Sequence, residues 1–119
     1  MRTETEPTME TISWEDFERV ELRAGTVLRV EPFPEARKPA YKIWVDFGPF
    51  GIKQSSAQLT KLYRFEELVG RQVIGVINFP PRQVAHFQSE VLITGFILEK
   101  REVVLAQPER KVPNGSKLA

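Results

Sequence analysis

A segment of alternating polarity, residues 20–31, constrains the fold more than any other stretch of this chain. One set of alternate positions is apolar or small, and the other set carries most of the charges. The first set is Val20, Leu22, Ala24, Thr26, Leu28 and Val30, and the charges are Glu21, Arg23, Arg29 and Glu31. Period-two alternation over this length predicts a long strand buried on one face. Gly25 in its middle predicts a bend or bulge, as when a sheet curls into a barrel.

Two shorter strands are predicted directly after it. Residues 41–47 alternate again, and Tyr41, Ile43, Val45 and Phe47 form their apolar face. Trp44 falls on the polar face, which is unusual for so large an apolar side chain. Gly48-Pro49 predicts a turn, so residues 50–55 can return as the partner strand of a hairpin.

The second half begins with helical spacing and then returns to strands. Residues 57–70 predict one or two short helices that end at Gly70. Residues 72–78 and 91–98 are apolar on both faces, which predicts strands buried on both sides. Residues 102–106 predict a shorter last strand.

The N-terminal end differs in character from the rest. Residues 1–11 are rich in Thr and Glu and predict a disordered acidic lead-in. Ser13 and Asp16 have the spacing of a capping box, which predicts a short helix from Trp14 to about Arg19. Residues 12–119 are then expected to form a single domain.

The order of elements indicates a fold class. A long bent strand, a hairpin, a helical connector and two or three further strands are typical of an OB-fold. We therefore predict an all-β chain with a five-stranded barrel, a short N-terminal helix and a helical connector between strands three and four. A β-sandwich is the alternative for a short all-β chain.

Composition excludes several classes of protein. At 119 residues the chain suits one modest core, and no apolar run approaches the about 20 residues of a membrane helix. Cysteine is absent, which excludes disulfides and thiolate chemistry. The polar start indicates no signal peptide, and we expect a cytoplasmic protein without membrane insertion. Residues 1–21 carry seven acids and two bases, whereas residues 22–119 carry nine acids and fifteen bases, so a basic body follows an acidic arm.

The stretch 78–90, Asn-Phe-Pro-Pro-Arg-Gln-Val-Ala-His-Phe-Gln-Ser-Glu, is the strongest candidate for a functional loop. Prolines stiffen it, and a core does not need its charged and aromatic residues. It contains His86, the only histidine, but no nucleophile motif, phosphate loop or paired metal ligands accompany it. We interpret the chain as a non-enzyme that uses no cofactor or metal.

Bases and aromatic residues suggest a binding surface instead. The bases are Arg37, Lys38, Lys42, Lys53 and Arg82, and the aromatic candidates are Trp44, Phe79 and Phe87. Such a set suits single-stranded nucleic acid, through phosphate neutralisation and stacking, and equally an extended peptide. Phe79 and Phe87 could as well belong to the core, Trp44 to a subunit contact, and Ser55-Ser56 to a helix cap.

Several motifs in fixed order resemble the CsaA-type secretion chaperones. They are residues 20–27, 33–42, 51–60, 70–83 and 87–92, followed by Val104-Leu105-Ala106-Gln107-Pro108 and Val112-Pro113-Asn114-Gly115. The likeness covers the chain from about residue 12 to its end. It implies the tRNA-binding-domain version of the OB-fold, a homodimer with terminal segments in its interface, and an export-related chaperone for unfolded or precursor polypeptides.

The wider superfamily includes tRNA-binding domains, so tRNA binding is the alternative function. The tRNA-binding motif usually has Asn-Leu where Asn78-Phe79 stands here, and a Met where Val91-Leu92 stands, which favours the chaperone branch. A purely structural dimer module is a third hypothesis. A secretion ATPase is a further candidate partner.

We accordingly predict an apolar pocket with a polar rim that binds peptides without ATP. The pocket residues are Phe79, Pro80, Pro81 and Phe87. The rim residues are Lys38, Lys42, Lys53, Ser55, Ser56, Asn78, Arg82, Ser89 and Glu90. Strands apolar on both faces exceed what one small barrel can absorb, which also favours a homodimer.

Overall fold

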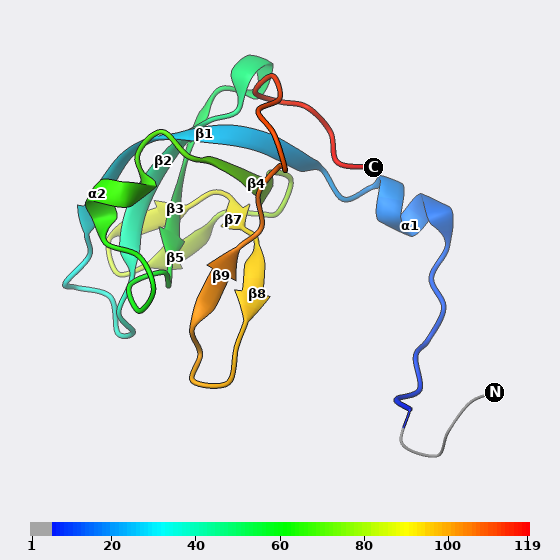
Figure 1. The fold of residues 1–119 in the computed structure, drawn as a ribbon, viewed down its shortest axis with the longest axis horizontal. Helices are drawn as coiled ribbons and strands as arrows, with labels where there is room; N and C mark the ends of the chain where they lie inside the picture. Colours follow the sequence, from blue (N-terminus) through cyan, green and yellow to red (C-terminus); the bar gives the residue numbers. More distant parts are fainter. Residues whose placement is uncertain (1–5) are drawn as a thin grey trace.

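A five-stranded antiparallel sheet organises the molecule, and the computed structural model describes residues 6–119 of it. Its order is β3-β2-β1-β4-β7, made of β1 (Leu22–Pro32), β2 (Tyr41–Asp46), β3 (Ile52–Ala57), β4 (Gln72–Val76) and β7 (Leu92–Ile93). The sheet curls so that β7 also lies near β3, which gives a nearly closed barrel (Figure 1). The predicted all-β OB-fold is confirmed.

Two hairpins are added to this barrel. In the first, β5 (Arg82–Val84) pairs with β6 (Phe87–Ser89), and β6 lies against β3. In the second, β8 (Gly95–Ile97) pairs with β9 (Val103–Leu105) and projects below the barrel (Figure 1). The stretch predicted as a stiff loop, residues 78–90, therefore contains a short hairpin.

Helices are few and short, as predicted. α1 (Trp14–Glu18) begins with the expected capping box, in which Ser13 and Asp16 exchange hydrogen bonds of 3.0 and 3.2 Å. The connector between β3 and β4 contains one helix, α2 (Phe65–Leu68), whose Leu68 is fully buried. A 3₁₀ turn, η1 (Gly48–Phe50), joins β2 to β3.

The bulge in β1 lies at Leu28 and not at Gly25, so the predicted position of a bulge is wrong. The register shifts at Leu28, between the pairs Val27–Val45 and Arg29–Trp44. The bulge turns Leu28 outward, where 45% of its surface is exposed, while Val27 and Val30 are buried. Strict alternation from residue 20 to 31 therefore placed the core on the wrong face in the first half of β1.

Gly25 instead makes room for Phe47. A Cβ at Gly25 would lie 2.7 Å from Cδ1 of Phe47 and 2.6 Å from Cγ1 of Val45. Gly75 on the neighbouring strand is equally close to the same ring, at 2.8 Å from Cζ. The fully buried Phe47 ring thus packs directly against the backbones of β1 and β4.

The predicted strand 91–98 is interrupted at Thr94. Both the backbone N–H and the hydroxyl of Thr94 donate to the carbonyl of Ile74, at 2.9 and 2.7 Å. The chain leaves β4 there and continues as β8 against β9, and the carbonyl of Thr94 accepts from the N–H of Ala106. This segment is not buried on both sides, because Leu92, Phe96 and Ile97 are exposed.

The C-terminal tail is held along β1. The N–H of Gly115 donates to the carbonyl of Ala24 at 2.7 Å, and the N–H of Leu118 donates to that of Leu22 at 2.9 Å. These bonds bring the tail close to α1 (Figure 1). Ala24 is buried beneath the tail rather than inside the barrel.

The N-terminal arm extends away from the barrel (Figure 1). Its described part, residues 6–12, is exposed and contains no helix or strand. Residues 1–5 of the predicted disordered lead-in lie outside the described residues. Within residues 6–119 no helix is long and apolar enough to span a membrane.

Candidate functional site

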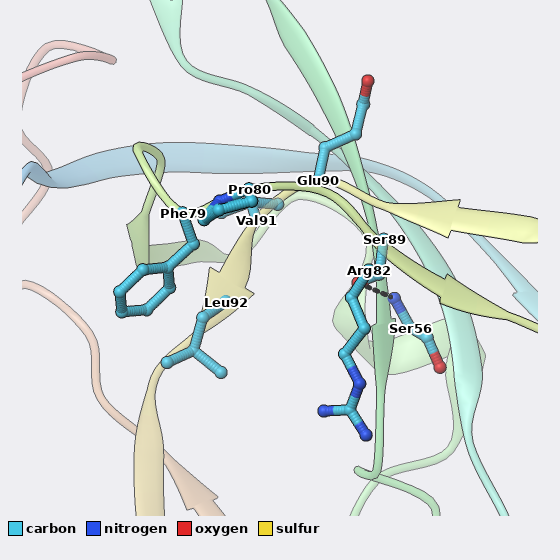
Figure 2. Close-up of a pocket in the computed structure, with 8 residues that line it drawn as sticks. All are labelled: Ser56, Phe79, Pro80, Arg82, Ser89, Glu90, Val91 and Leu92. Carbon is cyan, nitrogen blue, oxygen red and sulfur yellow. Dashed lines mark hydrogen bonds between the residues drawn. The ribbon is translucent and has the colours of Figure 1, made fainter.

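A pocket of about 420 Å³ opens where the loop after β4 meets β7 and the β5–β6 hairpin. Phe79, Pro80, Val91 and Leu92 supply its apolar wall. Figure 2 shows the Phe79 and Leu92 side chains side by side, and these are 52% and 51% exposed. The Arg82 side chain extends from the hairpin on the same side, whereas Glu90 points the opposite way (Figure 2). The pocket thus combines an open apolar wall with one cation.

Polar side chains fix the β5–β6 hairpin to the edge of β3. The hydroxyl of Ser89 accepts from the N–H of Ser56 at 3.0 Å, and the carboxylate of Glu90 accepts from the N–H of Gln54 at 3.0 Å. The Glu90 N–H returns a bond of 2.8 Å to the Gln54 carbonyl. Side-chain oxygens therefore take the place of a neighbouring strand and satisfy part of an open sheet edge. The same bonds position Arg82 at the mouth of the pocket.

A second pocket, of about 510 Å³, adjoins the first. The two pockets share three lining residues: Ser56, Arg82 and Ser89. The second pocket is more polar than the first, and its lining includes Arg37, Lys38 and Glu35 from the loop after β1. Together the two pockets form a groove, called here the hairpin groove, that changes from apolar to basic along its length.

Phe87 and Lys42 lie outside the hairpin groove, in a separate cluster. Phe87 is buried, with its ring centroid 5.5 Å from that of Phe33 and 5.9 Å from that of Trp44. The Lys42 ammonium lies 4.8 Å from the Phe33 centroid and 5.5 Å from that of Phe87, within cation–π range. The structure thus brings Phe79, Pro80 and Arg82 together but not Phe87 or Lys42.

Trp44 has contacts within its own chain. Its Nε1 donates to Oε1 of Gln54 at 3.2 Å, and the Arg29 guanidinium lies 4.8 Å from its ring. Phe87 packs against one side of the Trp44 ring. Trp44 lies on the outer face of the sheet and is half-buried by contacts within its own chain.

Ser55, Ser56 and Lys53 belong to β3. The register pairs Ser55 with Ile43 and Lys53 with Val45, so both lie on the face opposite to Ser56. Ser55 is fully buried, whereas Ser56 lines both pockets. Neither serine caps a helix, since the N-cap of α2 is Arg64. The helix-cap alternative is therefore wrong.

Asn78 joins the end of β4 to the start of β1. Its amide donates to the carbonyl of Arg19 at 2.7 Å and accepts from the N–H of Glu21 at 3.0 Å. Pro81 separates this clamp from the hairpin and lines neither pocket. Lys38 does line the basic half of the groove.

Val91 and Leu92 line the pocket but were not predicted as site residues. The apolar pattern of residues 91–98 predicted a strand buried on both sides, which left no face for a ligand. An apolar run too long for one barrel interior was the available signal, because part of such a run has to lie at a surface.

Two groups outside the groove have shifted pKa values. The hydrogen bond from Arg23, with Lys117 nearby, lowers the pKa of the Glu21 carboxyl. Burial raises the pKa of the Tyr41 phenol, with Glu66 and Glu67 adding to the effect. Tyr41 donates to the carbonyl of Tyr63 at 2.8 Å, a structural bond between β2 and the connector.

The chemistry available at the groove is that of non-covalent binding. Exposed aromatic and aliphatic side chains can hold apolar groups, and guanidinium and ammonium groups can meet carboxylates, carbonyls or phosphates. Across residues 6–119 no group of three or more His, Cys, Asp or Glu side chains is placed to hold a metal ion.

Comparisons with known proteins agree with this description. The family model described as "Putative tRNA binding domain" matches residues 22–117. The methionine–tRNA ligase of Porphyromonas gingivalis is 34% identical over 112 residues, which are 94% of this chain but 16% of that ligase. The chain therefore spans about a sixth of the length of such relatives.

Two solved structures match over their whole length. The chaperone CsaA from Bacillus anthracis is 50% identical with a TM-score of 0.88, and the match covers 92% of this chain and 100% of that one. The CsaA chaperone from Picrophilus torridus is 43% identical with a TM-score of 0.85 and the same coverage.

Fold, groove and family model together define a binding domain of the OB-fold class. The chain belongs to the tRNA-binding-domain family and, within it, is of the CsaA type. This confirms the resemblance found in its sequence motifs.

Proposed function

We propose that this protein is an export-related chaperone that binds unfolded or precursor polypeptides without ATP. The observation that carries the proposal is the open apolar wall formed by Phe79, Pro80 and Leu92 beside the Arg82 guanidinium. Half-exposed large apolar side chains in a pocket are costly for a soluble domain unless they meet a ligand. Clients of a chaperone differ in sequence, so a few weak, tolerant contacts suit the task.

The proposal is tested by titrating unfolded preprotein peptides, with no nucleotide present, against wild type and Phe79→Ala. We expect micromolar binding by the wild type. Removal of a half-exposed ring should weaken it by about tenfold, since a hot-spot truncation costs more than about 1 kcal/mol. Phe50→Ala is a matched control, because Phe50 is a similarly exposed ring on the η1 turn, away from the groove. Equal affinities for wild type and Phe79→Ala would place the site elsewhere.

A second candidate function is tRNA binding, which the family model supports. Arg37, Lys38 and Arg82 could meet phosphates, and Phe79 could stack on a base. Phosphate binding would make the affinity fall steeply with salt, with a slope of about −0.7 to −0.9 per phosphate. A gel shift with total tRNA at two salt concentrations tests this, and absence of a shift at low salt would exclude it.

We further propose a homodimer that acts in the cytoplasm, with a secretion ATPase as a candidate partner. The CsaA-type family supports the setting, and the exposed apolar side chains of α1 and of the β8–β9 hairpin support the dimer. A purely structural dimer module would bind neither peptide nor tRNA, so the peptide titration and the tRNA gel shift also test that alternative.

A further inference from the structure

The hairpin groove continues beyond its basic half into a third pocket. This pocket, of about 280 Å³, shares Lys38 and Gln58 with the second pocket and is also lined by Lys61 and Arg101. Three pockets in series thus run from Phe79 and Leu92 at one end to the connector and the β8–β9 turn at the other. Shared lining residues show that the three pockets are direct neighbours in this order.

Charge is distributed unevenly along this path. The second pocket has three cations against one acid, Glu35, and the third has three cations and no acid among its lining residues. The ammonium of Lys61 donates to the carbonyl of Lys100, which ties the connector to the β8–β9 turn next to Arg101. An ammonium has three donors, so two remain free for a ligand.

Among residues 6–119, the cations of the groove have no carboxylate partner in an ion pair. In the part of the chain that the structure describes, Arg37, Lys38 and Arg82 take part in no salt bridge. Glu90, the acid at the apolar end, points away from Arg82 and is engaged with the N–H of Gln54 (Figure 2). The basic end therefore has unmatched positive charge for an incoming ligand.

We infer that the groove selects extended polypeptide segments in which acidic side chains lie a few residues from an apolar residue. The apolar residue would occupy the pocket of Phe79 and Leu92, and the acidic side chains would lie toward Lys38, Lys61 and Arg101. Opposite charges across a binding surface fix which partners are accepted and in which register. This inference rests on the proposed peptide-binding function and gives it a direction and a sequence preference.

The test uses labelled peptides that share one Leu-Leu pair and differ only in a second pair, Glu-Glu, Gln-Gln or Lys-Lys, placed at several separations. We expect the Glu-Glu peptide to bind best at one separation, by about three- to tenfold over Gln-Gln, because exposed ion pairs contribute modestly. The double variant Lys38→Glu/Lys61→Glu should abolish that preference, so that the Glu-Glu peptide no longer binds better than the Gln-Gln peptide. Phe79→Ala should weaken all three peptides equally.

Lys111→Glu is the matched control, because it changes the same kind of exposed charge at a site outside the groove. Its preference for Glu-Glu should equal that of the wild type. Equal affinity of the wild type for the Glu-Glu and Gln-Gln peptides would overturn the inference and leave the proposed function intact. Loss of tRNA binding in Lys38→Glu/Lys61→Glu, with no change in peptide preference, would also overturn it and would assign the basic end to RNA. Failure of every peptide to bind would instead contradict the proposed function itself.

Discussion

The Phe47 ring can pack against the backbone of β1 because residue 25 is a glycine and has no side chain. A methyl group at position 25 would overlap the Phe47 ring and Val45 Cγ1. We predict that Gly25→Ala lowers the free energy of unfolding by about 1–3 kcal/mol, the usual cost of overpacking a core. Urea denaturation measures it.

The double variant Gly25→Ala/Phe47→Leu separates overpacking from other causes. Its loss should be smaller than the sum of the single losses, because the smaller side chain leaves room for the added methyl group. Strictly additive losses would mean that the ring is not the obstacle.

Glu21 links β1 to the C-terminal tail through charge. Its carboxylate accepts from Arg23 Nε at 3.0 Å and lies 3.4 Å from Lys117 Nζ, and these partners lower its pKa below 4.5. A lowered pKa stabilises the folded state above the unfolded pKa, and this stabilisation is lost as pH falls through the folded pKa. We predict that Glu21→Gln has a lower Tm than the wild type at neutral pH.

The difference in Tm should shrink toward zero as pH falls through the lowered pKa of Glu21, because the wild-type carboxyl then becomes protonated as well. Thermal melts of both proteins across this range measure it. A Tm difference that persists unchanged in acid would show that packing, not charge, accounts for the loss.

For single residues, the sequence showed which stretch carries polar and aromatic side chains, but not which of them bond within the chain. Asn78, Ser89 and Glu90 stand in a decorated loop and were predicted as ligand contacts, yet each makes hydrogen bonds with backbone N–H groups of its own chain. Their partners, Glu21, Gln54 and Ser56, lie far away in sequence. Local pattern carries no information on such long-range pairs, whereas Phe79 and Arg82 could be recognised from their neighbours alone.

Among the elements, the β5–β6 hairpin has the clearest structural task, since it covers the edge of β3. We predict that Ser89→Ala/Glu90→Ala exposes the Gln54 and Ser56 amides to exchange, because both lose their acceptors. Each lost bond should cost about 0.5–1.5 kcal/mol. Hydrogen exchange followed by NMR at these two amides measures the effect.

The amide of Ile43, buried at the centre of β2, is an internal reference for this experiment. Its protection should change only by the loss of global stability. Equal loss of protection at all three amides would contradict a local role for the hairpin.

Period and composition predicted the barrel strands, but neither the strand interruptions nor the β5–β6 hairpin. The bulge at Leu28 and the change of partner at Thr94 both depend on which strand lies alongside. A two-residue period indicates an extended chain, but it does not tell which strand pairs with that chain. For this reason the long alternating segment predicted a strand correctly, but its core-facing side incorrectly in the part before the bulge.

At the scale of the whole molecule, large apolar side chains are exposed on α1 and on the β8–β9 hairpin. Trp14 is 86% exposed on a five-residue helix that has no buried residue, and so short a helix is not stable alone in water. Phe96 and Ile97, on the hairpin below the barrel, are 64% and 76% exposed. Tail and connector do not cover them, so a second copy of the chain is the expected cover.

We predict that the protein sediments as a dimer at micromolar concentration and that Ile97→Glu shifts it toward monomer. A carboxylate buried without a partner in an apolar interface costs more than about 1.4 kcal/mol, so the dissociation constant should rise at least tenfold. Lys100→Glu adds the same group at the turn of the same hairpin, beyond its apolar residues, and should leave the dimer intact. A wild-type monomer at micromolar concentration would contradict the dimer, and equal effects of both variants would place the interface away from Ile97. Because Leu92 belongs to the same run of exposed apolar residues, a monomeric variant also shows whether the hairpin groove binds peptide without its partner.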